Sequence, residues 1–141
     1  MYVRKLFAAA SLTMSMIVPT VALAGEPMAP AGCVLGGYQI VSVTPYRIEE
    51  RTGRALSVRR LHGAEIRVQA QPGLTAEWLQ LTLQERLQEA KRGDIHDCVL
   101  ETDVSRVEVD STGTGFMVRL VAKDTKKAEE VLHRANVLAG A

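Results

Sequence analysis

The first 24 residues constrain the fold most, because they have the pattern of a segment that is removed before folding. Arg4 and Lys5 precede an uncharged apolar run, and Ala22 and Ala24 stand at the −3 and −1 positions of a cleavage site. This is the pattern of a secretory signal peptide, and its apolar run is too short to span a bilayer. We therefore expect cleavage after Ala24 and an exported, periplasmic or extracellular protein without a membrane span.

The mature chain has the size of one domain. Cleavage after residue 24 leaves 117 of the 141 residues, and the predicted division is an N-terminal arm at 25–37 and a single domain at 38–141. Two of the 17 Lys and Arg lie in the signal, which leaves fifteen against 16 Asp and Glu. This balance gives no sign of a nucleic-acid or anionic-membrane partner. Arg54, Arg59 and Arg60 form a local basic cluster that indicates a solvated strand face, with an anion-binding patch as the alternative.

Two cysteines remain after cleavage, Cys33 near the mature start and Cys98 in the middle of the chain. In an oxidising compartment an even pair predicts a disulfide, and closing a loop of about 65 residues stabilises a fold by about 4 kcal/mol in the chain-entropy model. The alternative is a lipidated Cys33, since Ala31 and Gly32 precede it as in a lipoprotein signal. Pro30 stands where such signals carry a leucine-like residue, and this disfavours lipidation.

Alternation of apolar and polar residues predicts six strands. Thr44-Pro45 separates the first two strands, a turn ending at Gly53 separates the next two, and His62-Gly63 interrupts the chain again. The predicted strands are Tyr38–Val43, Tyr46–Glu50, Ala55–Arg60, Ala64–Ala70, Val104–Asp110 and Phe116–Lys123.

A helix over residues 76–90 has the strongest local signals. Thr75 is a good N-cap, and Leu74 and Leu79 occupy the positions of a hydrophobic staple. Its pattern continues to Ala90, and Lys91-Arg92-Gly93 supplies a basic last turn and a glycine stop. Trp78 is the only tryptophan, and we expect it to anchor this helix in the core, with stacking on a ligand as the alternative.

A second helix begins at Asp124 or Thr125 and carries one apolar stripe. The predicted order is therefore β-β-β-β-α-β-β-α. It favours an α+β fold, a small antiparallel or mixed sheet with both helices packed on one face, and it resembles a ferredoxin-like half-plait by analogy only. The stripe consists of Ala128, Val131, Leu132, Ala135 and Leu138.

The densest group of possible metal ligands lies after the first helix, at Asp94, His96, Asp97 and Cys98. Imidazole, carboxylate and thiolate are suitable ligands for zinc or copper. A disulfide at Cys98 would remove the sulfur, and no second ligand pair is near in sequence. The expected reading is a solvated loop without metal or cofactor, and an envelope metal-binding protein using Asp94, His96 and Cys98 is the alternative.

No catalytic arrangement stands out in the sequence. The serines lack a nucleophile-elbow context and the carboxylates alternate with basic residues, so a small hydrolase is only a third hypothesis. The leading hypothesis is a non-enzymatic exported domain that binds a protein or another envelope partner. The expected contact surface is an unpaired edge strand or the wet face of the sheet. That face would carry Glu65, Arg67, Arg106, Glu108 and Arg119.

Overall fold

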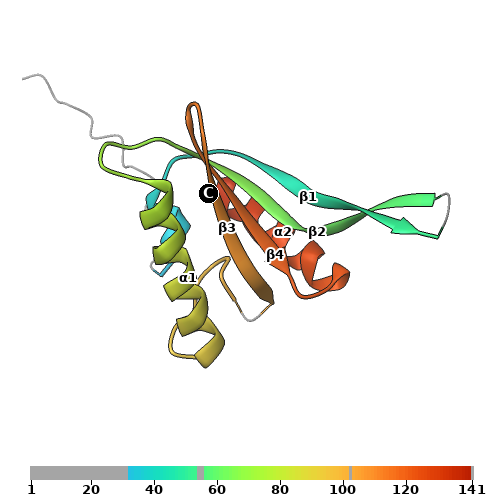
Figure 1. The fold of residues 1–141 in the computed structure, drawn as a ribbon. Coiled ribbons are helices and arrows are strands. Elements are labelled where there is room, and N and C mark those ends of the chain that lie inside the picture. Colours follow the sequence, from blue (N-terminus) through green and yellow to red (C-terminus); the bar gives the residue numbers. More distant parts are fainter. Residues whose placement is uncertain (1–31, 54–55, 102, 141) are drawn as a thin grey trace, which may run out of the picture.

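The computed structural model describes residues 32–53, 56–101 and 103–140. The described chain forms an α+β domain whose four-stranded sheet is antiparallel throughout, with the spatial strand order β1-β2-β4-β3 (Figure 1). The elements are a short 3-10 helix η1 (Val34–Gly37), β1 (Ile40–Thr52), β2 (Leu56–Gln69), α1 (Ala76–Arg92), β3 (Val104–Thr112), β4 (Gly115–Ala122) and α2 (Thr125–Ala139).

The first two strands are each longer than predicted. β1 runs through Pro45, which is tolerated because β1 is an edge strand of the sheet. β2 runs through a β-bulge: Tyr46 pairs with Gly63 but Arg47 pairs with Leu61, so His62 is the extra residue. Four strands therefore replace the predicted six and the order is β-β-α-β-β-α, which does not confirm the half-plait analogy.

Gly63, beside the bulge, is required where it stands. Its φ of +151° is rarely adopted by L side chains, and a Cβ at this position would collide with the Leu120 carbonyl oxygen of β4. The close approach of β2 to β4 at this point therefore depends on glycine. The interruption expected at His62-Gly63 is a bulge inside one strand and not a loop between two.

Both helices begin as predicted. The Thr75 hydroxyl accepts a hydrogen bond from the Trp78 amide at 3.2 Å, and a carboxylate oxygen of Asp124 accepts from the Lys127 amide at 2.9 Å. α1 ends at Arg92, with Lys91 and Arg92 in its last turn, and stops at Gly93, whose φ is +80°, as predicted.

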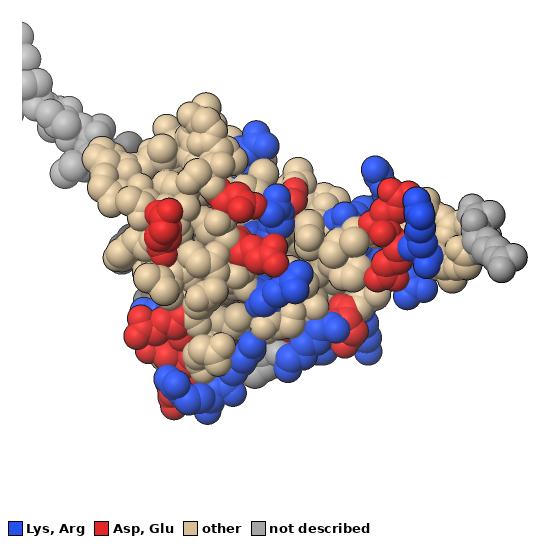
Figure 2. Space-filling model, in the orientation of Figure 1, with Lys and Arg blue, Asp and Glu red and all other residues tan. Residues whose placement is uncertain are grey.

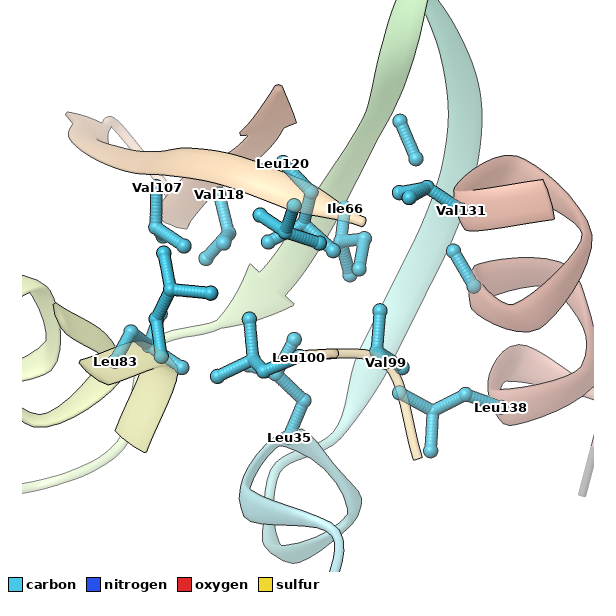
Figure 3. Close-up of a cluster of buried hydrophobic side chains, with 14 of the residues drawn as sticks. Leu35, Ile66, Leu83, Val99, Leu100, Val107, Val118, Leu120, Val131 and Leu138 are labelled. Atoms are coloured by element: carbon cyan, nitrogen blue, oxygen red, sulfur yellow. The ribbon is translucent and has the colours of Figure 1, made fainter. Parts of the chain in front are cut away.

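The two helices share one face of the sheet, as predicted. The core contains Leu83 of α1 and Val131 of α2 with alternating residues of β2 and β4, such as Ile66 and Val118 (Figure 3). Each helix packs mainly beside strands of the other hairpin: α1, which follows β2, contacts β3, and α2, which follows β4, contacts β2 and β1. The two halves of the chain are therefore interlocked.

Irregular chain fills the space between the two helices. Leu35 of η1 and Val99 and Leu100 of the loop before β3 are fully buried there (Figure 3). A disulfide joins Cys33 to Cys98 with their α-carbons 5.1 Å apart, which confirms the predicted pairing. η1 lies within the segment predicted as an N-terminal arm, and its Leu35 contributes to the core.

Two burial predictions were wrong. Trp78 is 53% exposed, because Leu79, Leu83 and Leu87 form the buried stripe of α1 and Trp78 lies about 100° around the helix from Leu79. Leu132 of α2 is only partly buried, and Val131 next to it occupies the fully buried position.

Candidate functional site

The outer surface of α1 carries two large exposed hydrophobic side chains, Trp78 and Leu81. They are 53% and 66% exposed and stand three residues apart, so they are neighbours on the helix surface. Tryptophan is rare on surfaces that contact only water and common at the centre of protein interfaces. We refer to these two side chains and the two hollows beside them as the α1 surface.

The first hollow lies at the beginning of α1. It encloses about 300 Å³ and is lined by Trp78 and Leu74, by Tyr38 just before β1, and by Gln71, Pro72 and Gly73 of the turn before the helix. None of these side chains is an acid or a base at neutral pH. Burial raises the pKa of the Tyr38 hydroxyl above its ordinary value. This hollow is therefore neutral, partly aromatic and suited to an apolar side chain.

The second hollow lies between α1 and β3 and encloses about 460 Å³. Leu81 and Leu87 supply its apolar part, and Glu85 and Arg106 stand at its border. The other lining residues are Gln84, Gln88, Ser105 and Val107. Since Leu81 borders this hollow and Trp78 borders the first, the exposed pair connects the two.

Side chains of α1 occupy part of the free edge of β3. The Gln80 amide donates to the Val107 carbonyl oxygen at 2.7 Å and accepts from the Val109 amide at 2.5 Å, as a neighbouring strand would. Lys91 donates to the Ser105 carbonyl oxygen at 2.8 Å. These contacts protect the edge of β3 against strand addition. Of the two edge strands, β1 is thus the better candidate for the predicted unpaired edge.

The five charged residues predicted for the wet face do share one face of the sheet. Glu65, Arg119 and Glu108 lie directly opposite one another across β2, β4 and β3. Arg119 pairs with Glu65 at 2.9 Å and with Asp110, and it lies over the Tyr46 ring. Arg106 pairs with Glu108 at 2.8 Å, while Arg67 is exposed on the same face. Much of this charge is therefore neutralised within the protein.

The four predicted metal ligands have different surroundings in the structure. Asp94 forms an exposed ion pair with Arg92 at 2.7 Å, His96 is exposed, and the Cys98 sulfur is in the disulfide. Asp97, whose carboxylate lies near both sulfurs, is only 3% exposed. Its oxygens accept from three backbone amides, those of Val34, Val99 and Leu100, at 2.9 to 3.0 Å. Asp97 thus holds η1 and the loop before β3 together.

The β1–β2 pair extends well beyond the sheet. In the described part of the chain β2 pairs with β4 only over 63–69, whereas its pairing with β1 continues to Thr52 and Leu56 (Figure 1). We refer to residues 47–52 and 56–61 as the projecting hairpin. Side chains 56–60 are all exposed, and both basic and acidic side chains lie along the hairpin (Figure 2). The sequence predicted its strands but not their projection.

No protein-family model, curated protein or solved structure matches the chain. Among the helices that the structure describes, none is long and apolar enough to cross a membrane.

Proposed function

We propose that this protein is an exported, non-enzymatic domain that binds a polypeptide partner through the α1 surface. The observation that carries the proposal is Trp78, the largest side chain of the protein, which is 53% exposed between two hollows. Tryptophan is enriched among the residues that dominate binding energy, and a half-exposed tryptophan still has a large apolar area to bury.

The chemistry of the hollows favours apolar side chains of a polypeptide. Tyr38, Leu74 and Trp78 offer aromatic and aliphatic contacts at the first hollow, and Leu81 offers an aliphatic contact at the second. Gln71 at the first hollow and Gln84 and Gln88 at the second add neutral amide side chains that can hydrogen-bond a partner's main chain. This combination of apolar pockets with a polar surround is the usual anatomy of a protein interface.

The engagement of the ionisable side chains supports a non-enzymatic role. Asp97 is satisfied by backbone amides, the Cys98 sulfur is in a disulfide, and Arg119 is held by two carboxylates. His62, just outside the projecting hairpin, lies beside Glu50 at 3.1 Å. These groups stabilise the fold, and catalysis would require them to be free for a substrate.

A site-specific photo-cross-linker tests the proposed contact in cells that produce the protein. Placed at Trp78 or at Leu81, it should give the same discrete cross-linked polypeptide. Val137 of α2 is a matched control, because it is 59% exposed and hydrophobic but lies on the other helix. An equal pattern from Val137, or a discrete product only from β1 positions such as Val41, would refute the α1 surface as the contact.

Export is tested separately. The mature protein should begin at Gly25 when its N-terminus is sequenced, because Ala22 and Ala24 are the small residues that signal peptidase requires. A protein that retains Met1, or that carries a diacylglycerol on Cys33, would contradict the proposed cleavage.

A further inference from the structure

The projecting hairpin separates basic and apolar side chains onto its two faces. Directly opposite residues of an antiparallel pair share a face, and the register after the bulge pairs Arg47 with Leu61 and Glu49 with Arg59. Arg51 follows on this same face, which thus carries three arginines and one glutamate. Without the bulge at His62 the β2 side chains would exchange faces.

The other face of the hairpin is largely apolar. Leu56 and Val58 are 71% and 45% exposed, and Ile48 is half-buried on the same face. Its two charged residues, Arg60 and Glu50, pair with each other at 3.3 Å, so this face has little net charge. Leu56 pairs with Thr52, the last pair of β1 with β2 in the described chain, at the end of the hairpin away from β4.

The whole protein is nearly neutral, but its basic and acidic residues are unevenly distributed between the hairpin and the rest of the chain. The described hairpin has four arginines and two glutamates, whereas the mature chain has fifteen basic and sixteen acidic residues, so the remainder is acidic. An anionic surface would attract the end of the hairpin and repel the rest of the protein. Because the hairpin projects, its end can reach such a surface while the acidic remainder stays away.

We propose that the projecting hairpin binds the surface of a bilayer that contains anionic phospholipids. Leu56 and Val58 enter the boundary between headgroups and acyl chains, where their exposed apolar area leaves water. Arg51 and Arg59, on the opposite face, stay at the level of the headgroups, where their guanidinium groups pair with the lipid phosphates. This contact uses a different surface from α1 and does not depend on the proposed polypeptide partner.

Flotation of the mature protein with vesicles tests the proposal. Vesicles with about 30% phosphatidylglycerol in phosphatidylethanolamine should bind the protein, and pure phosphatidylcholine vesicles should not. Binding should weaken as NaCl rises from about 50 to about 500 mM. The variants Arg51→Gln and Arg59→Gln should each lower the partition coefficient about fivefold, and Leu56→Ser combined with Val58→Ser should lower it further.

Matched variants on α2 provide the controls. Lys126→Gln removes an exposed basic side chain, and Val137→Ser removes an exposed apolar one, so both should leave vesicle binding unchanged. Absence of binding to phosphatidylglycerol vesicles at low salt would overturn the proposal. Binding that the serine variants leave intact would overturn it as well, because charge alone would then attract the protein.

Discussion

Replacing Asp97 is expected to destabilise the protein strongly, although its carboxylate touches only backbone. It is 3% exposed and accepts hydrogen bonds from three amides that belong to η1 and to the loop before β3. In Asp97→Ala two buried donors and one part-buried donor lose their acceptor, and each buried donor costs about 1–3 kcal/mol. Loss of the carboxylate's own burial penalty offsets part of this cost. We therefore expect a decrease of about 3–5 kcal/mol in the free energy of unfolding.

The amide variant Asp97→Asn should be intermediate. Its oxygen can still accept from the amides of Val99 and Leu100, which Oδ1 of Asp97 accepts at 3.0 Å each. The side-chain NH₂ group then faces the Val34 amide, where Oδ2 accepted at 2.9 Å, so two donors oppose each other. One lost charge-assisted bond and one unsatisfied donor correspond to about 1–3 kcal/mol.

Urea unfolding of the mature protein, followed by circular dichroism with the disulfide intact, measures both values. Asp94→Ala is the control, because Asp94 is exposed and its ion pair with Arg92 is exposed as well, so the change should stay within about 0.5 kcal/mol. A cost below about 1 kcal/mol for Asp97→Ala would refute the argument. An asparagine variant less stable than the alanine variant would do the same.

Three further outcomes are expected. Replacing Cys33 and Cys98 together by serine, or reducing the disulfide, should lower the free energy of unfolding by about 4 kcal/mol in the chain-entropy model. A thiol assay on protein that has been unfolded without a reducing agent should find no free thiol. Leu83→Ala should cost about 2–5 kcal/mol because Leu83 is fully buried, whereas Leu81→Ala, with 66% exposure, should stay within about 0.5 kcal/mol in the same urea assay. Gln80→Leu should lower the free energy of unfolding by about 1–2 kcal/mol, because the Val107 carbonyl and the Val109 amide on the edge of β3 lose their partner. The freed edge should increase self-association in analytical ultracentrifugation. A monomer at all concentrations would argue against an edge-protecting role for Gln80.

Local patterns in the sequence predicted the elements and the shared face of the helices but not the continuity of the long strands. The N-caps Thr75 and Asp124 act within one turn of chain, so their effect is visible in sequence. A strand passes through Pro45 because β1 is an edge strand of the described sheet, and through His62-Gly63 because of the pairing with β4 and β1. Both facts depend on partners distant in sequence.

The candidate site was predictable in part. The spacing of Leu79, Leu83 and Leu87 already places Trp78 off the buried stripe, so its exposure could have been inferred from helix phase. The Asp97 carboxylate bonds the amides two and three residues ahead, a common local pattern for aspartate. The two faces of the projecting hairpin could not be assigned, because a single bulge residue decides which side chains share a face.

Each helix packs on strands of the other hairpin, and this arrangement has a consequence for folding kinetics. Since α1 covers β3 and α2 covers β2 and β1, a fragment ending after α1, or one beginning at β3, lacks the partner for its only long helix. Neither fragment should fold alone, and mixing the two should restore structure. In the intact chain the rate-limiting event is expected to be the joining of β2 to β4, a contact between residues far apart in sequence, so loss of order should be all-or-none.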